Sequence, residues 1–422
     1  MGSMREVTVV GGGMAGLSAA LRLAEAGAAV TLREGSGRLG GKLRTEHGLE
    51  AGAENFLMRD PGGGPSAAVL LCELLGLADD IVHPTGLPAG LLIKGGLKPL
   101  PRGTFLGIPG PETDLEGVAA LGGSDVDTGQ PVVGADDVSV GEVVRARMGD
   151  DVVDKLVDPL LGGVYAGRAD GLSLEATMPG LFKLLQTEHT LAEAVRRGVR
   201  PSTGEPVFGT VVGGLSRLIE AATTRLADLG AQIHLLEPVR ALPDGPVVLA
   251  VPGAKAARLL DGHPPLEYAS VALVTMELPP VELPELSGFL VPESEDLSIK
   301  AATFFSRKWP HVKDTMVRLS LGRAGDPVVL QAPDDVLVEL ARRDLSKVVG
   351  ALPAPLAARV DRWGGGLPQY EPGHVRRVAQ FRASLRDRPI ALAGAAYDGV
   401  GIPACVKSGW QAADLLLERW MA

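Results

Sequence analysis

The sequence predicts an α/β protein of two or three domains that opens with a strand–helix–strand unit. Its 422 residues exceed the length of one ordinary domain. Apolar residues make up 45% and charged residues 22%, a mix typical of a globular protein with a sizeable core. The first fifty residues show strand, helix and strand patterns in turn, and residues 390–420 again read as strand, glycine-rich turn and helix.

The opening unit starts with a short β-branched strand at residues 7–10, followed by the turn Gly11-Gly12-Gly13-Met14-Ala15-Gly16. A helical pattern then runs to Gly27, and a second strand at residues 29–32 leads to Glu34. This order of strand, glycine turn, helix, strand and acid is typical of a unit that binds a dinucleotide.

Each residue type in the turn has a physical role. Gly11 permits the tight turn, Gly13 lets the backbone approach a pyrophosphate, and Gly16 lets the helix pack closely. The pyrophosphate is expected at the positive end of the helix, and Glu34 is expected to accept hydrogen bonds from the adenosine ribose. The alternative is a plain glycine-rich turn.

The loop that follows favours FAD over a nicotinamide cofactor. It runs from Gly35 to Lys42, directly after the ribose acid, where a nicotinamide enzyme more usually enters its next helix. Arg38 and Lys42 are expected to neutralise phosphate, and Gly40 with Gly41 to let the backbone pass close to the flavin. The alternative is a charged loop in solvent.

The remaining elements are predicted from periodicity and turn residues. In the helix at 66–77, Ala67, Leu70, Leu71, Leu74 and Leu77 are expected to form the apolar face. Further helices are predicted at 139–157 (broken near Gly149), 213–226, 336–349 and 405–420. Strands are predicted at 233–236, 246–251, 271–278, 287–292, 298–305 and 390–393, with a linker at 107–137 and a boundary at 201–206.

Composition excludes several functions. The net charge of −10 argues against a nucleic-acid partner, whose phosphates demand a basic face. Two cysteines, Cys72 and Cys405, cannot build a disulfide scaffold, and the seven histidines show no metal-ligand spacing. No apolar run reaches eighteen residues and no signal-peptide pattern precedes Val7, so a cytoplasmic protein with at most peripheral membrane contact is expected.

Along nearly its whole length the chain resembles the FAD-dependent protoporphyrinogen/coproporphyrinogen oxidases, of the soluble bacterial form, within the amine-oxidase-like flavoenzymes. The glycine turn, Glu34 and the Arg38-x-Gly40-Gly41 loop belong to the wider superfamily. The motifs particular to the oxidases are found at residues 50–59, 159–167, 173–177, 362–374 and 394–403.

The resemblance implies a Rossmann-type FAD-binding domain with an interleaved substrate domain (antiparallel sheet plus helices) and an inserted helical domain. The FAD-binding domain would comprise residues 4–74, 204–262 and 376–422, with strands near Val239 and Val251. The substrate domain would comprise 75–108, 178–203 and 263–375, and the helical insertion 109–177. Beyond the residues already named, the resemblance assigns cofactor contacts to Gly52, Ala53, Glu54, Asn55, Val239, Trp363, Gly394, Val400, Gly401 and Ile402.

The implied reaction is the oxygen-dependent, six-electron oxidation of a porphyrinogen to the porphyrin in heme biosynthesis, with release of H2O2. Coproporphyrinogen III is the favoured substrate. Arg59 is the candidate partner of a propionate, with a surface arginine as the alternative. Tyr165, Phe304 and Tyr370 are candidate pocket walls, with core packing as the alternative. Glu54 is a candidate catalytic residue, with a helix or turn cap as the alternative.

Several alternatives stay open at this stage. They are protoporphyrinogen IX as substrate, another amine-oxidase-like or carotenoid-desaturase-like oxidoreductase, and a non-catalytic flavin-binding paralogue. The last alternative rests on departures from the family pattern at Ala53, Glu54 and Ala404 and on shortened stretches at 107–137 and 240–247. Expected partners are the porphyrinogen, O2 and a chelatase or next heme-pathway enzyme, with the chain a monomer or homodimer and without a metal.

Overall fold

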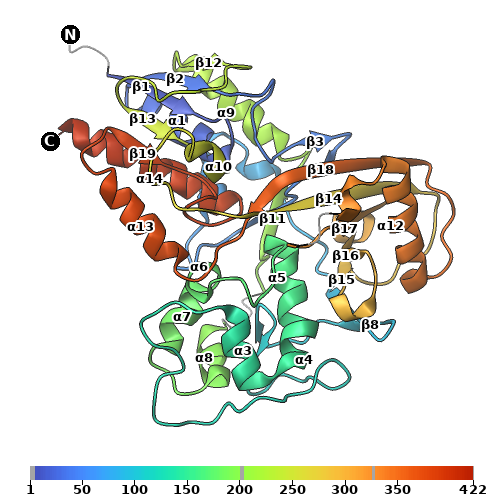
Figure 1. Cartoon of the computed structure of the whole chain (residues 1–422). Coiled ribbons are helices and arrows are strands. Elements are labelled where there is room, and N and C mark those ends of the chain that lie inside the picture. The colour runs from blue at the N-terminus through green and yellow to red at the C-terminus, as the bar shows by residue number, and fades with distance from the viewer. Residues whose placement is uncertain (1–4, 200–203, 326–327, 422) are drawn as a thin grey trace. The chain divides into compact units, whose positions relative to one another are not determined.

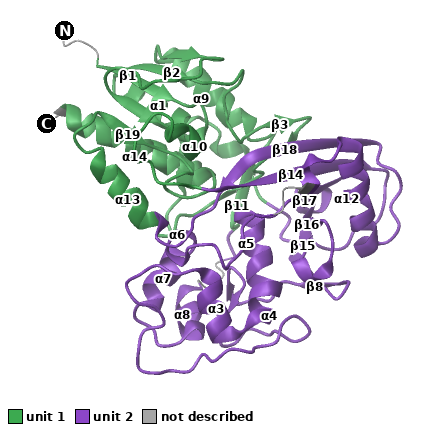
Figure 2. Ribbon diagram, in the orientation of Figure 1, with its two compact units in different colours: residues 1–83, 206–266, 375–422 green, residues 84–205, 267–374 purple. Residues whose placement is uncertain are grey.

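The computed structural model describes residues 5–199, 204–325 and 328–421 (Figure 1). The chain forms two compact units, each assembled from separated segments (Figure 2). The first unit comprises residues 1–83, 206–266 and 375–422, and the second comprises 84–205 and 267–374. The predicted helical insertion lies wholly within the second unit. The predicted division into three functional domains therefore stays a prediction.

The centre of the first unit is a five-stranded parallel sheet with the order β12-β2-β1-β13-β19. The strands are β1 (Glu6–Val10), β2 (Ala29–Arg33), β12 (Gln232–His234), β13 (Val247–Leu249) and β19 (Ile390–Leu392). β13 and β19 are buried at every position, as expected for strands covered on both faces. Three distant parts of the sequence therefore supply one sheet.

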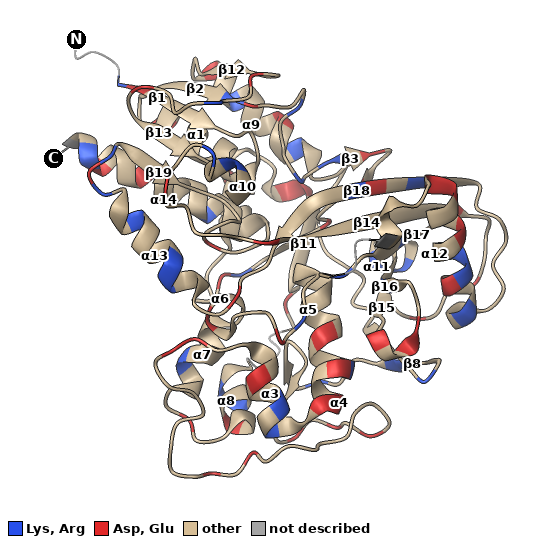
Figure 3. Ribbon diagram, in the orientation of Figure 1, with Lys and Arg blue, Asp and Glu red and all other residues tan. Residues whose placement is uncertain are grey.

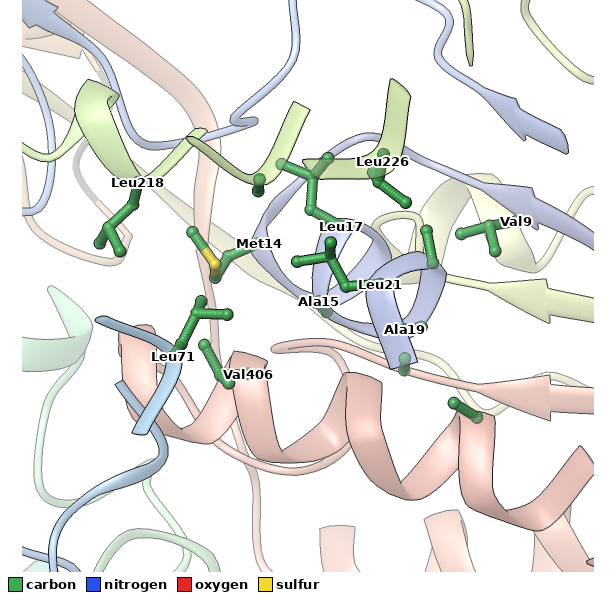
Figure 4. Packing of buried hydrophobic residues seen from close by; sticks show 14 of the residues in the cluster. Val9, Met14, Ala15, Leu17, Ala19, Leu21, Leu71, Leu218, Leu226 and Val406 are labelled. Atoms are coloured by element: carbon green, nitrogen blue, oxygen red, sulfur yellow. The ribbon is translucent and has the colours of Figure 1, made fainter. Parts of the chain in front are cut away.

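Helix α1 (Met14–Glu25) joins β1 to β2 and is buried along almost its whole length. It packs against α14 (Ile402–Met421) and α9 (Ser216–Asp228). Figure 4 shows Met14, Leu71 and Val406, from three different elements, turned toward one another in this core. Fully buried leucines such as Leu17 each contribute on the order of 1.5–3 kcal/mol of hydrophobic stabilisation. The remaining helices of this unit are α2 (Ala67–Leu74), η1 (Ala78–Asp80), α10 (Gly253–Ala256) and α13 (His374–Ser384).

Three expectations for this unit are corrected. The apolar face predicted for α2 is wrong at Leu70 and Leu74, which are 39% and 44% exposed, whereas Leu71 and Leu77 are buried as predicted. No strand lies near Val239, which follows β12 in an extended loop. The last helix starts at Ile402 rather than Cys405, since Cys405 N already donates to Gly401 O at 3.1 Å.

Short strands complete the first unit. β5 (Phe56–Leu57), β11 (Phe208–Val211) and β6 (Ile81–Val82) form a small antiparallel sheet, and β3 (Thr45–Glu46) pairs with β4 (Leu49–Glu50).

The second unit contains a seven-stranded sheet with the order β18-β14-β17-β16-β15-β7-β8. All neighbouring pairs are antiparallel except β15 and β7. The long helix α12 (Asp334–Val349) packs on one face through Leu337, Ala341 and Leu345. The strands are β7 (Ala89–Ile93), β8 (Gly96–Pro99), β14 (Tyr268–Leu278), β15 (Gly288–Leu290), β16 (Ile299–Phe304), β17 (Thr315–Leu321) and β18 (Ala357–Pro368).

Short helices between residues 140 and 198 make up the rest of this unit. The predicted break near Gly149 is present, because Gly149 ends the first of these helices with a φ of 92°. Ser139 caps that helix by accepting a hydrogen bond from Glu142 N, as its sequence spacing predicts. The helices are α3 (Val140–Met148), α4 (Asp150–Val152), the π-helical turn η2 (Val153–Val157), α5 (Asp158–Tyr165), α6 (Leu174–Thr177), α7 (Pro179–Leu185) and α8 (Leu191–Gly198). Smaller elements are β9 (Thr104–Phe105), β10 (Ile108–Pro109), η3 (Glu293–Glu295), α11 (Phe305–Lys308) and η4 (Val328–Gln331).

Charged side chains of both signs are distributed over each unit. Figure 3 shows Lys and Arg interspersed with Asp and Glu on the ribbon of both units, with no purely basic face in this view. None of the described helices is both long and apolar enough to cross a membrane. In the described part of the chain, no group of three His, Cys, Asp or Glu side chains could hold a metal ion.

Candidate functional site

The candidate site lies at the carboxyl edge of the parallel sheet in the first unit, where β1 enters the glycine turn. Gly11 has a φ of +106°, and a side chain there would meet Ala250 O at 2.3 Å. A Cβ at Gly16 would lie 1.8 Å from Gly11 O. Both positions therefore require glycine for the chain's own packing, as the sequence predicted.

Gly13 differs from these two glycines. The nearest protein atom to a Cβ at Gly13 would be Gly41 Cα, 4.0 Å away, and Gly13 has a φ of −75° that any residue adopts. Gly13 is also the N-cap of α1, and no side chain caps this helix end. An open space beside uncapped amides at the positive end of a helix fits a phosphate. The residues present therefore suit a pyrophosphate-bearing cofactor.

Glu34 is held at the end of β2 by two backbone groups. Gly12 N donates to one of its carboxylate oxygens and Ser36 N to the other, each at 2.7 Å. Each oxygen keeps capacity for a further hydrogen bond. This geometry suits the predicted contact of Glu34 with two ribose hydroxyls. The hydrogen bond from Gly12 N shows that the glycine turn itself holds the Glu34 carboxylate in place.

The loop after Glu34 folds back over the glycine turn. Gly40 N donates to Gly12 O at 2.8 Å, which ties the loop to the turn. Arg38 donates from Nη1 to Leu39 O and Leu43 O, both at 3.1 Å, and from Nη2 to Gly41 O. The guanidinium therefore holds the loop closed. The role of the Arg38 charge in neutralising a cofactor phosphate stays a prediction.

A second helix N-terminus lies at the same edge of the sheet. Gly394 N donates to Ser408 Oγ at 2.8 Å, and Ser408 Oγ in turn donates to Asp398. Arg382 holds Asp398 with two hydrogen bonds of 2.7 and 2.6 Å. This network, together with positive φ angles at Gly394, Gly399 and Gly401, positions the turn that starts α14.

The loop and α14 approach each other through Lys42 and Cys405. The two side chains interact electrostatically, although burial is the main influence on both. Burial lowers the pKa of the Lys42 ammonium, and it raises the pKa of the Cys405 thiol to about 11. Lys42 is an exposed residue, but the protein atoms around its ammonium group desolvate it. This desolvation disfavours the charged form of the side chain. The predicted cofactor segments around residues 13, 42 and 402 therefore meet in one place.

Sequence reasoning missed two sets of residues that build this site. Asp398 lies within the motif at residues 394–403, but nothing in the sequence indicates its partners Arg382 and Ser408. The second set centres on Glu50, a buried carboxylate that accepts hydrogen bonds from Leu215 N at 2.6 Å and Thr45 Oγ1 at 3.0 Å. These contacts tie the β3–β4 hairpin to the start of α9, across 165 residues of sequence.

The segment that follows Glu50 contains the remaining candidates of the first unit. Glu54 is only 7% exposed, so it is not a solvent-facing acid, and its catalytic role stays a prediction. Arg59 is exposed, and its Nη1 donates to Gly63 O at 2.7 Å, in the turn that follows β5. Its contact with a propionate stays a prediction.

The aromatic candidates lie in the second unit. Tyr165 and Tyr370 meet edge to face with ring centres 5.8 Å apart, and Tyr370 stacks on His374 at 4.5 Å. Burial raises the pKa of Tyr165 to about 12. Phe304 is completely buried in the core between the sheet and α12, which favours the alternative of core packing, and its place in a pocket wall stays a prediction. Trp363 lies in β18 opposite Val271, and its contact with the cofactor stays a prediction.

Comparison with known proteins identifies the family. The profile of the flavin-containing amine oxidoreductases matches residues 14–417. The chain belongs to this family. It is 38% identical to the coproporphyrinogen III oxidase of Mycobacterium tuberculosis, over 98% of both chains. It is 29% identical to the coproporphyrinogen III oxidase of Bacillus subtilis, over 96% of both chains. A crystal structure from Exiguobacterium, described as a protoporphyrinogen oxidase, superposes with a TM-score of 0.85 at 33% identity over 99% of both chains.

Membership confirms the predicted class of flavoenzyme and its FAD cofactor. Glu34, the glycine turn and the start of α14 are the parts of the chain that suit this cofactor. The assignment of individual contacts to them stays a prediction.

Proposed function

We propose that the protein oxidises a porphyrinogen to the porphyrin in heme biosynthesis, with coproporphyrinogen III as its substrate. The observation that carries this proposal is the 38% identity to coproporphyrinogen III oxidases over 98% of the chain. The reaction consumes three O2 and releases three H2O2 for each porphyrin formed, so six electrons and six protons leave the substrate. Bound FAD supplies two-electron redox chemistry, and the protein supplies binding and orientation.

The geometry of the first unit supports this reaction. The uncapped start of α1 suits the pyrophosphate, and Glu34 suits the ribose. The amides at the start of α14, near Gly401, lie at the same edge and favour negative charge close to them. Arg59 is exposed and carries the positive charge that contact with a propionate requires.

The alternatives make different predictions for one experiment. Purified protein should show the absorbance of an oxidised flavin, and anaerobic mixing with coproporphyrinogen III should bleach it. Readmitting O2 should then produce porphyrin fluorescence and three H2O2 per porphyrin. Bleaching only by protoporphyrinogen IX would favour that substrate, and bound flavin that neither porphyrinogen bleaches would contradict the proposal. That second outcome is the one expected of the non-catalytic flavin-binding paralogue, and a protein that binds no flavin, even when FAD is added, would likewise contradict the proposal.

Arg59 is tested by its effect on KM. Arg59→Ala should leave flavin content intact and lower kcat/KM for coproporphyrinogen about ten- to a hundredfold, because a partly exposed charge-assisted pair contributes roughly 1.5–3 kcal/mol. The loss should appear mainly in KM, and Arg59→Lys should recover part of it. Arg258→Ala, which removes another exposed arginine of the first unit, is the control. An unchanged KM in Arg59→Ala would place the propionate contact elsewhere.

Handover of the porphyrin to a chelatase or the next heme-pathway enzyme, a monomeric or homodimeric state, and a cytoplasmic location complete the proposal. The lack of a membrane-crossing helix among the described residues is compatible with this location.

A further inference from the structure

A histidine meets a tyrosine beside the turn that begins α14, within the first unit. His263 lies in the segment after α10, and its Nε2 is 3.0 Å from the Tyr397 hydroxyl oxygen. The two rings meet edge to face with centres 5.7 Å apart, and His263 meets Phe381 of α13 in the same way at 5.1 Å. Tyr397 and Phe381 are 6% and 5% exposed, so this contact is part of the packed core.

The hydrogen bonds of the imidazole decide which of its nitrogens carries a hydrogen. Nδ1 of His263 lies 2.7 Å from Pro264 O, and a carbonyl oxygen can only accept, so Nδ1 is the donor. In the neutral imidazole, Nε2 is then an acceptor, and the Tyr397 hydroxyl donates to it. Only the neutral form of His263 accepts this hydrogen bond from the tyrosine.

The surroundings of His263 disfavour its charged form. Burial lowers its pKa, and the hydrogen bond to the neighbouring carbonyl offsets part of this effect. α13 carries Arg377 and Arg382, and Arg382 pairs with Asp398 of the turn. Asp261, on the same segment as His263, is exposed. None of these four charged groups is among the causes of the pKa shift, so burial is the main cost of protonating the imidazole.

The tyrosine belongs to the turn that leads into α14. Tyr397 N donates to Gly394 O at 3.0 Å, and Asp398 N donates to the same oxygen at 3.3 Å. The turn is therefore held through two successive side chains, by the Arg382 network at Asp398 and by His263 at Tyr397. The position of this turn sets where the first amides of α14 lie.

We propose that His263 is a positioning residue of the FAD site, which in its neutral form fixes Tyr397 and thereby the turn that presents the first amides of α14. Protonation places a charge where burial disfavours it, so the contact between the two rings is released and the turn loosens. A group whose pKa is lowered by folding stabilises the folded contact above its unfolded pKa, near 6.5, and loses this effect as the pH falls. FAD affinity should therefore decrease toward acidic pH. The proposal concerns FAD binding and does not depend on which substrate is oxidised.

Titration of the flavin-free protein with FAD between pH 7.5 and pH 5.0 tests the role of His263. The wild type should bind FAD about three- to tenfold more weakly at the lower pH. His263→Phe keeps the ring contacts without an acceptor, so it should bind FAD at pH 7.5 as weakly as the wild type does at pH 5.0. His263→Gln has an uncharged acceptor oxygen, so it should keep wild-type affinity at pH 7.5 and lose the pH dependence.

The tyrosine is tested by removing its hydroxyl alone. Tyr397→Phe should weaken FAD binding at pH 7.5 as much as His263→Phe does. The double variant should lose no more than either single variant, because both changes remove the same hydrogen bond. His83→Phe is the matched control, since His83 is another half-buried histidine of the first unit bonded to a backbone carbonyl, and it should behave as the wild type.

Two results would overturn the proposal. One is a His263→Phe variant with the FAD affinity and pH dependence of the wild type, and the other is a double variant whose losses add. If His263→Phe does not fold, His263→Gln decides the question, because a pH dependence that persists in this variant cannot come from His263. A protein that shows the expected pH dependence of FAD binding but oxidises no porphyrinogen would refute the proposed function and leave this proposal standing.

Discussion

Two helices of the first unit begin at the same edge of the parallel sheet, but different forces position their first turns. The start of α1 is shaped by steric contacts among neighbouring residues, because Gly11 and Gly16 leave no room for a side chain. The start of α14 is shaped by the hydrogen-bond network that links Gly394, Ser408, Asp398 and Arg382. A turn whose conformation is set by steric contacts between neighbouring residues can be predicted from a short sequence motif. A turn that is held by side-chain hydrogen bonds depends on residues outside the motif, so the motif alone does not predict it.

The largest expected effect comes from Gly13→Val. The protein leaves the space beside Gly13 open, so valine should fit the fold but occupy the place of the pyrophosphate. FAD affinity should fall about a thousandfold or more, with the thermal midpoint of the flavin-free protein little changed. Flavin content after purification and titration with FAD measure this. The control is Gly180→Val, another open glycine without positive φ, and normal flavin occupancy in Gly13→Val would refute the assignment.

Glu34→Ala should weaken FAD binding about a hundredfold, since two hydrogen bonds to a charged acceptor contribute on the order of 3 kcal/mol. The change also frees Gly12 N and Ser36 N, so the turn itself should loosen. Glu34→Gln keeps one acceptor oxygen and should lose less. An unchanged dissociation constant for FAD in Glu34→Ala would mean that this carboxylate serves the turn alone.

Asp398→Asn tests the second helix start. It removes the charge that binds Arg382 through two hydrogen bonds and Ser408 through a third, so stability should fall by about 1–3 kcal/mol. Thermal and denaturant unfolding measure the change. Asp414→Asn disrupts a more exposed pair with Arg22 and should cost about 0.5 kcal/mol or less. Equal effects of the two variants would show that the network does not hold the turn.

The smallest effect is expected from Gly401→Ala. Gly401 has a φ of +100° with no protein atom within 4 Å of an added Cβ, so alanine should introduce backbone strain of about 1 kcal/mol without a clash. Gly245→Ala, with a φ of +82° and similar open space, should cost the same stability. FAD titration should nevertheless show weaker binding only for Gly401→Ala. Equal FAD affinities in the two variants would indicate that the start of α14 does not approach the cofactor.

The sequence by itself determined the parts of this protein that depend on neighbouring residues. The order of β1, glycine turn, α1, β2 and Glu34 follows from β-branched runs, glycines and helical spacing, and the structure contains these elements as predicted. The cap at Ser139 and the break at Gly149 were predictable for the same reason, because their geometry depends on three or four consecutive residues. The expected enzyme class followed from several such motifs together.

Only the tertiary structure decided which faces are buried and which distant groups meet. Leu70 and Leu74 are apolar residues that the sequence pattern assigns to the core, yet both are exposed. The burial of a side chain depends on where neighbouring elements pack against its helix, and these two side chains lie outside the packed surface of α2. Phe304 is fixed in the core by the position of α12. His263 reads as an ordinary histidine in a loop, and only its approach to Phe381 and Tyr397 places it beside the turn that begins α14. Local patterns specify conformation through short-range sterics, whereas burial and charge environment arise from contacts between elements that are separated in the sequence.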